Sequence, residues 1–276
     1  MDGRRPGRGL AGAGDAPRIV AITSRDNPLL VRARRLAAQP DAYRRQGCVL
    51  LEGEHLCEAW IARRGGAGVD AIVSTQAWER PALRRLAQAA ETVAVVEAAL
   101  VSAASTLEAP PPLLFLAPWA GTGDIDPDAP GVLLDRVQDA GNVGTILRSA
   151  AAFGCRQVVA LKGTAALWSP KVLRAAMGAH LGLHLVESVE EDALDGWQVP
   201  LLATGSHDGE PLHRARLAWP CAWAFGHEGR GLSASLAARC AARVRIEQPG
   251  GEESLNVAAA AAICLYESAR RRIAAP

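Results

Sequence analysis

Short apolar runs that alternate with segments of helical periodicity constrain the fold of this chain more than any other feature. The runs read CVLLEG, VDAIVS and TVAVVE in the first half, and GVLLDRV, RQVVAL, LHLVE, PLLATG, CAWAFG and ARVRIE from residue 131 onward. Strands that are almost continuously apolar are typical of a sheet that helices cover on both faces. The alternation therefore predicts an α/β fold.

The alternation occurs twice, and the two series are separated by a stretch rich in proline and glycine. Residues 108–130 contain APPP and GTGDIDPDAP, which indicate turns and a linker. A chain of 276 residues also accommodates about two domains. We therefore expect a disordered basic tail over residues 1–17, a small α/β domain over 18–108, a linker over 109–130 and a second α/β domain over 131–276.

The positive charge is concentrated near the start of the chain, although the net charge is only +1. Residues 1–45 hold ten arginines against four aspartates. Clustered arginines of this kind either contact nucleic-acid phosphates or form a solvated face. The candidates for phosphate contacts are Arg25, Arg32, Arg34, Arg35, Arg44 and Arg45.

Several classes of protein and site are disfavoured by composition and spacing. No apolar run approaches the roughly 18–20 residues of a membrane span, and the opening residues lack the apolar segment of a secretory signal, so we expect a cytoplasmic protein without a membrane partner. The six cysteines are far apart and contain no C-x-x-C pair, which predicts buried thiols. His180 and His184 lack a third ligand nearby, so we expect no metal.

Three polar clusters follow predicted strands of the second half, whereas neither half has the G-x-G-x-x-G turn of a dinucleotide-dependent oxidoreductase. The first cluster is DAGNVGTILRSAAAFG, residues 139–154. It places Asn142 at a strand-to-helix turn that offers free amide donors, and Arg148 off the apolar face of a helix expected from Gly144. A capping asparagine and a surface arginine remain the simpler interpretation.

The second and third clusters are both glycine-rich. In AFGHEGRGLS, residues 224–233, the glycines predict a sharply turned backbone that holds Glu228 at its tip, with Ser233 as the N-cap of the next helix. A hairpin-like turn explains that pattern nearly as well. In IEQPGGEESLNVAAAAAICLYE, residues 246–267, Ser254 and Asn256 open a predicted helix. Simple capping by Ser254 is the alternative there.

Together the three clusters give N-x-G-x-x-x-R-x-A-x-x-F-G, G-x-E-G-x-G and S-L-N-V in this order, a far more specific pattern than any one of them. Residues 131–276 with this pattern resemble the SpoU (TrmH-like) family of RNA 2′-O-ribose methyltransferases in the SPOUT superfamily. Residues 20–115, with SRDNPLLVRARRL and LLEGEHLCEA, resemble the substrate-binding domain often placed ahead of it. The resemblance implies a deep trefoil knot, S-adenosylmethionine as the methyl donor, RNA as the partner and a homodimer.

The resemblance also implies roles for particular residues. The donor pocket would be lined by Gly226, Ile246 and Leu255, together with Gly229 and Gly231. The positions associated with catalysis and its support are Asn142, Arg148, Glu228, Ser254 and Asn256. Where the family often has Ile-Pro-Met, this chain has Ile246-Glu247-Gln248, which leaves the pocket contour over residues 247–251 open.

Methyl transfer to a ribose hydroxyl requires an aligned oxygen and assistance with the loss of its proton. Arg148 is the expected group beside that hydroxyl, but an arginine is a poor base at neutral pH. Either its proton affinity is strongly depressed, or it stays cationic, grips a phosphate and stabilises the developing alkoxide. We favour the cationic form. Ribosomal RNA is the expected acceptor; transfer RNA, or a non-catalytic RNA-binding role for the same fold, are the alternatives.

Overall fold

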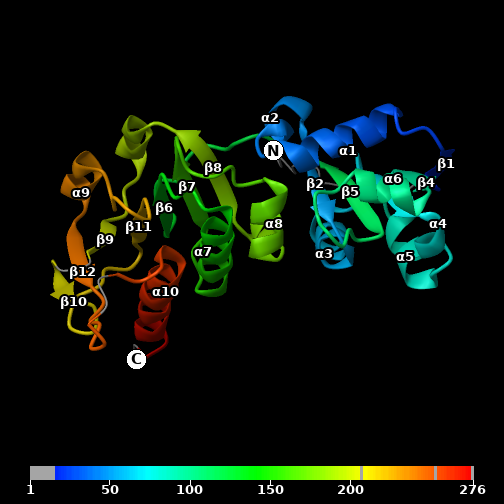
Figure 1. The fold of residues 1–276 in the computed structure, drawn as a ribbon. Coiled ribbons are helices and arrows are strands. Elements are labelled where there is room, and N and C mark those ends of the chain that lie inside the picture. The colour runs from blue at the N-terminus through cyan, green and yellow to red at the C-terminus, as the bar shows by residue number, and fades with distance from the viewer. Residues whose placement is uncertain (1–15, 206–207, 252–253, 275–276) are drawn as a thin grey trace, which may run out of the picture.

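The structure is a computed structural model that describes residues 16–205, 208–251 and 254–274. It contains two β-sheets that lie side by side (Figure 1). We refer to residues 16–118 as the N-terminal domain and to residues 131–274 as the C-terminal domain. The tail expected over residues 1–17 falls, except for its last two residues, outside the described part of the chain.

The N-terminal domain is built on a five-stranded sheet of order β1-β4-β3-β5-β2. β1, β4 and β3 are parallel, and β5 is antiparallel to both β3 and β2. The strands are β1 (Arg18–Ile22), β2 (Cys48–Glu52), β3 (Asp70–Ser74), β4 (Thr92–Val96) and β5 (Leu113–Pro118). The helices are α1 (Pro28–Ala38), α2 (Ala42–Gln46), α3 (Glu54–Arg64), α4 (Thr75–Trp78), α5 (Pro81–Ala87) and α6 (Ala98–Ala103).

The main difference from the sequence prediction in this domain concerns β5. Its residues lie inside the stretch expected to be a linker, but they form a fully hydrogen-bonded strand between β3 and β2. The apolar run LLFLAP is flanked by proline-rich turns, which masked its strand character. The segment that connects the two sheets is therefore shorter than expected and covers residues 119–130.

The C-terminal domain has a seven-stranded sheet of order β10-β12-β9-β11-β6-β7-β8, in which every pairing is parallel. The strands are β6 (Gly131–Asp135), β7 (Gln157–Leu161), β8 (His184–Val189), β9 (Leu201–Gly205), β10 (Glu210–Pro211), β11 (Ala222–Gly226) and β12 (Ala242–Arg245). The helices are α7 (Ala140–Ala152), α8 (Pro170–Ala176), α9 (Ala234–Arg239) and α10 (Val257–Ala274), with short 3-10 turns η1 (Ala179–Gly182) and η2 (Glu191–Gly196).

Helices cover both faces of this sheet, as the apolar strands predicted. Alternate residues of β6 and β11, such as Leu134 and Trp223, pack with α7 and α10 in one core cluster. Their neighbours, such as Leu133 and Ala224, pack on the other face with Leu236 of α9. The predicted α/β architecture with parallel strands is confirmed.

α7 and α8 pack at van der Waals distance because Gly144 has no side chain. A Cβ atom on Gly144 would lie 2.4 Å from the Cβ of Ala175 and 2.8 Å from the carbonyl oxygen of Val172. Any larger residue would push the two helices apart. The glycine therefore fixes the spacing between α7 and α8, and α8 is also the helix that contacts β2 of the N-terminal domain (Figure 1).

Two carboxylates connect the domains. The buried Glu187 of β8 accepts hydrogen bonds from the Tyr43 hydroxyl, at 2.5 and 2.6 Å, and from the Arg44 guanidinium at 3.1 Å. The buried Glu52 of β2 pairs with Arg174 of α8. Burial, followed by the charge of Glu187, raises the pKa of Tyr43 well above its ordinary range, so its hydroxyl remains a donor. These contacts place the N-terminal domain on α8 and β8.

Candidate active site

The three polar clusters converge at the carboxyl ends of β6 and β11 and at the start of α10. The loop after β11 turns so tightly that a Cβ atom on Gly226 would lie 2.2 Å from the carbonyl carbon of Gly231. The His227 amide donates to the Gly231 carbonyl oxygen at 3.1 Å, and the Gly231 amide donates back at 2.8 Å. The predicted sharp turn is confirmed, with Gly231 in the left-handed region at φ 65°.

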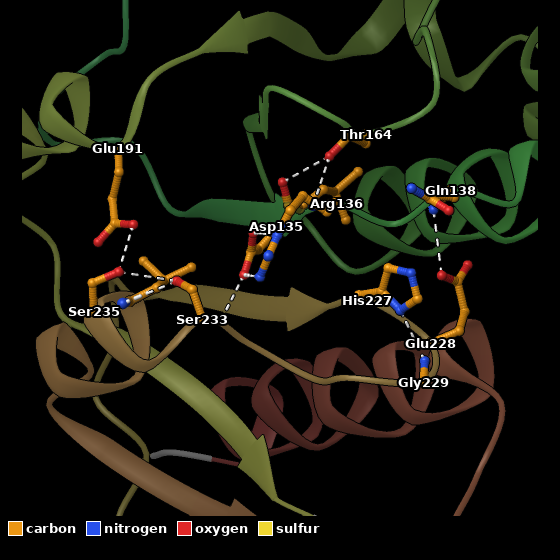
Figure 2. Close-up of polar contacts among 12 residues, drawn as sticks. Asp135, Arg136, Gln138, Thr164, Glu191, His227, Glu228, Gly229, Ser233 and Ser235 are labelled. Carbon is orange, nitrogen blue, oxygen red and sulfur yellow. Dashed lines mark hydrogen bonds and ion pairs between the residues drawn. The ribbon is translucent and has the colours of Figure 1, made fainter.

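Glu228 connects the tip of this loop to the first cluster. One carboxylate oxygen accepts from the Asp139 amide and from Asn142 Nδ2, each at 3.2 Å. The other oxygen accepts from the Gln138 amide at 3.3 Å, a contact that Figure 2 shows. Glu228 therefore fixes the residues between β6 and α7 relative to the loop after β11.

The ionisation of Glu228 follows from these contacts. Partial burial raises its pKa, but hydrogen bonds from its own amide, Asn142, Asp139 and Gln138 outweigh that effect. The net result is a pKa below the ordinary value of 4.5. The carboxylate is therefore charged at neutral pH, which makes it a structural acceptor and a poor proton acceptor.

Asn142 continues the chain of contacts to the third cluster. Its Oδ1 accepts from Asn256 Nδ2 at 2.9 Å. Asn256 Oδ1 in turn accepts the amides of Ala258 and Ala259, at 2.9 and 3.2 Å. Glu228, Asn142 and Asn256, which come from three separate segments of the sequence, thus form one hydrogen-bonded series.

Two helices, α7 and α10, begin at other residues than the sequence predicts, because other side chains cap them. The helix expected from Gly144 begins at Ala140, because Asp139 caps it by accepting the Asn142 amide at 2.8 Å. Asn142 is therefore not a cap, and its side chain is available to Glu228 and Asn256. Likewise α10 begins at Val257 and not at Ser254, since Asn256 provides the first acceptor. The predicted N-cap at Ser233 is confirmed by its contact with the Leu236 amide at 3.2 Å.

A cavity of about 640 Å³ lies beside this series. It is lined by residues of the loop after β11 and by the segment that leads into α10. Gly226, Glu228, Gly229, Gly231, Ile246, Ser254, Leu255 and Asn256, all singled out from the sequence, are among the lining residues. The structure thus brings every proposed donor-binding residue to one cavity, with Gln248 of the uncertain 247–251 stretch also in its wall.

Arg148 is the one predicted catalytic residue that stands apart. It is exposed on α7 and makes no hydrogen bond or ion pair with any residue that the structure describes. On the helix it shares a face with Gly141 and Thr145, toward which its side chain leans. Its guanidinium is therefore a free cation on the exposed surface of α7, the helix that also carries Asn142.

Asp135 is a supporting residue that the sequence analysis missed. Its buried carboxylate, at the end of β6, holds Arg136 in a bidentate pair at 2.7 and 2.9 Å. It also accepts the Ser233 amide at 2.8 Å, which anchors the far side of the glycine-rich loop (Figure 2). The sequence feature that could have identified Asp135 is an acidic residue at the end of an otherwise apolar strand.

The six arginines predicted to contact RNA divide into two groups. Arg32 contacts Cys48 Sγ and Asp70, Arg44 pairs with Glu187, and Arg45 contacts Asp41 and Gln39. The side chains of Arg25, Arg34 and Arg35 make no polar contact with any described residue. This second group is available to an external anion.

The described residues contain neither a candidate metal site nor a helix that could span a membrane. Within the described ranges no group of three or more histidine, cysteine or acidic side chains is arranged to hold a metal. His180 is buried against the Leu167 carbonyl oxygen, while His184 contacts the Asp124 carbonyl oxygen. Five cysteines are buried thiols and Cys240 is half-buried. No helix in the described part has the length and apolar character to cross a membrane.

Comparison with known proteins identifies the family. The profile of the SpoU rRNA Methylase family matches residues 130–266. A tRNA/rRNA methyltransferase of Synechocystis, itself uncharacterized, is 35% identical over 93% of this chain and 96% of its own length. The chain belongs to the SpoU family. The resemblance deduced from the three clusters is therefore confirmed.

Two rRNA methyltransferases extend the match beyond the residues that the profile covers. A 23S rRNA (uridine-2′-O)-methyltransferase of Streptomyces viridochromogenes is 30% identical over 71% of this chain and 72% of its own length. The crystal structure of an AdoMet-bound rRNA methyltransferase from Sinorhizobium meliloti superposes with a TM-score of 0.78 at 26% identity. That match covers 92% of this chain and 98% of the other, so it includes the N-terminal domain.

Proposed function

We propose that this protein transfers a methyl group from S-adenosylmethionine to a ribose 2′-hydroxyl of ribosomal RNA. The observation that carries the proposal is the hydrogen-bonded series Glu228, Asn142 and Asn256 beside the cavity at the carboxyl ends of β6 and β11. Ligands of open parallel sheets bind at this end of the strands. The relatives of Streptomyces viridochromogenes and Sinorhizobium meliloti, both named as rRNA methyltransferases, support ribosomal RNA over transfer RNA and a catalytic over a non-catalytic role.

The cavity fits the proposed donor. Its volume of about 640 Å³ lies within the roughly 300–1,000 Å³ of small-molecule sites. Ile246, Leu255 and Leu232 offer apolar walls for a nucleobase, whereas the glycines of the loop expose backbone groups for polar parts of the ligand. When bound, S-adenosylmethionine supplies an electrophilic methyl group on a sulfonium.

Arg148 is proposed to act on the acceptor ribose as a cation. A guanidinium that lacks an internal partner binds an RNA phosphate readily and can stabilise negative charge that develops on the 2′-oxygen. Proton removal is then left to water or to the phosphate. Glu228 and Asn256 hold Asn142 in place, and Ser254 borders the donor cavity.

A second copy of the chain is proposed to pack on α10. Ile263, Tyr266 and Ile273 of this helix are 40, 55 and 86% exposed, which is unusual for large apolar side chains along one helix. An apolar strip of this kind is typical of a subunit interface. Light scattering tests this, and Tyr266→Glu is expected to shift a dimer toward monomer.

The proposal also includes a knotted chain path, an RNA-binding role for the N-terminal domain and a place of action. The segment that leads into α10 lines the same cavity as the loop after β11, which supports a knotted path of the chain there. The N-terminal domain is proposed to bind the RNA substrate, with Arg25, Arg34 and Arg35 on its phosphates. The proposed place of action is the cytoplasm.

The test is incorporation of a radiolabelled methyl group from S-adenosylmethionine into ribosomal RNA and, separately, into transfer RNA. Arg148→Ala is expected to abolish incorporation while donor binding, measured by calorimetry, stays within about twofold. Arg85→Ala, which removes an exposed arginine of α5 without polar contacts, is the matched control. Retained turnover of Arg148→Ala would remove this residue from the mechanism, and labelling of neither RNA would overturn the proposed function.

A further inference from the structure

A second cavity, of about 460 Å³, lies between the two domains and is lined by aromatic side chains. Trp60 comes from α3, Trp119 from the residue after β5, and Trp168 from the turn before α8. Leu183 and Leu185 of the C-terminal domain add apolar surface, and Arg64 and His184 add polar groups. Three tryptophans around one opening are a large share of the seven in this chain.

This cavity is separate from the donor cavity. His184, which lines it, is the first residue of β8, whereas Gly226 in the donor cavity is the last residue of β11. Because all strands of the sheet are parallel, these residues lie at opposite ends of it. β8 is also three strands away from β11, so the two cavities are on the order of 25 Å apart.

One polar group of a cavity-lining side chain has no partner within the described part of the chain. The Trp119 indole Nε1 is buried and has no hydrogen-bond partner. An unpaired buried indole N–H is unusual, and a ligand acceptor that reaches it would satisfy it. Trp119 itself is held in place by an edge contact with Tyr43, at 5.0 Å between ring centroids.

One unpaired guanidinium lines the opening and two more lie beside it. Arg64 lines it, and Arg63 Nη1 lies 3.0 Å from the position of a Cβ on Gly182, next to Leu183. The side chains of both arginines are exposed and have no polar contact with any described residue. Arg156, whose side chain is also without a partner among the described residues, lines a smaller adjoining cavity with Gly182 and His184. Asp124 and Asp126 of the connecting segment are the acidic residues nearby, the first through its backbone contact with His184.

We propose that this interdomain cavity binds one unpaired nucleobase of the RNA, with Arg63, Arg64 and Arg156 on the adjoining phosphates. Aromatic side chains beside guanidinium groups are the recurrent means by which proteins hold single-stranded RNA, through stacking and phosphate contacts. The inference rests on the proposed function, since it takes RNA as the substrate. Given the separation from the donor cavity, the bound base belongs to a flanking nucleotide and not to the methylated one.

The test compares two probes: a short fluorescent oligoadenylate, and an abasic oligomer with the same number of phosphates. The wild-type protein is expected to bind the oligoadenylate about tenfold more tightly than the abasic oligomer. Trp119→Ala should abolish this preference and leave the abasic affinity unchanged. Arg64→Ala should weaken both probes alike, because it removes a phosphate contact.

Two controls keep the result interpretable. Ala120→Leu adds bulk at the exposed rim of the cavity without removing any core packing, and it should also abolish the base preference, even if Trp119→Ala folds poorly. Trp78→Ala removes a half-buried tryptophan elsewhere in the N-terminal domain and should keep the preference. Equal binding of the two probes by the wild-type protein, or an unchanged preference in both cavity variants, would overturn the proposal.

Methyl transfer is measured in parallel on the same variants. Methylation without any base preference would refute the nucleobase site and leave the proposed function intact. Base preference without methylation would support the nucleobase site and overturn the proposed function. The two proposals therefore fail in distinguishable ways.

Discussion

Glu187 and Glu228 are two carboxylates that each join segments far apart in the sequence, but their surroundings differ. Glu187 is buried between the domains, where it accepts a tyrosine hydroxyl, an arginine and the Leu167 amide at 3.1 Å. Glu228 is exposed and accepts mainly backbone amides and an asparagine. The same chemical group therefore stabilises the domain arrangement in one place and orders the candidate active site in the other.

The largest expected effect is on stability, at the buried carboxylate. Glu187→Ala leaves Arg44 and the Tyr43 hydroxyl without their acceptor in a desolvated place, so the free energy of unfolding should fall by about 3–5 kcal/mol. Urea unfolding followed by circular dichroism measures this change. A loss below about 1 kcal/mol would show that water replaces the carboxylate. Glu187 would then not have the stabilising role that distinguishes it from Glu228.

A large effect on turnover, with little effect on stability, is expected at the exposed carboxylate. Glu228→Gln replaces one accepting oxygen by an amide donor that faces backbone N–H groups, so the turn that carries Asn142 shifts. Displacement of reacting groups by about 1 Å costs on the order of 100-fold in rate. Methylation rate and urea stability are measured together. A variant that loses stability but retains its rate would show that Glu228 contributes to folding and not to turnover.

A smaller effect is expected from the arginine that accompanies Glu187. Arg44→Leu removes a half-exposed cation but leaves Tyr43 and Leu167 as donors to the carboxylate, so unfolding should be easier by only about 1–2 kcal/mol. Urea unfolding followed by circular dichroism measures this change in the free energy of unfolding. A loss equal to that of Glu187→Ala would mean that the ion pair, and not the set of hydrogen bonds, holds the domains together.

The smallest effect is on pH dependence. Since the folded pKa of Glu228 is lowered below 4.5, its contribution to loop order is complete above that pH and is lost as the pH falls through the folded value. Carbon-detected NMR titration of the Glu228 carboxyl group measures the midpoint. A midpoint at or above 4.5 would contradict the hydrogen-bond pattern at the site.

The strands and helices were predictable where local periodicity and local caps determine them. Ser233, for example, caps α9 as expected. β5 was not recognised because proline-rich turns flank its apolar run, and because its place between β3 and β2 depends on pairing with distant segments.

The site was predictable as a set of residues but not as a geometry. Motif order led to Glu228, Asn142 and Asn256, yet it gave no sign that Asn142 connects the other two. The Gln138 and Asp139 amides that hold Glu228 are backbone groups, which leave no signature in a sequence. Glu187 was read only as part of the run LHLVE, since nothing local reveals that Tyr43 and Arg44 would meet it.

The close packing at Gly144 has a mechanical consequence. α7 carries Asn142 and Arg148, while α8, its neighbour without an intervening side chain, is fastened to the N-terminal domain through Arg174 and Glu52. Because Gly144 leaves no gap between the two helices, any displacement of α8 would also displace α7. The position of the N-terminal domain on α8 therefore bears on where α7 holds Asn142 and Arg148.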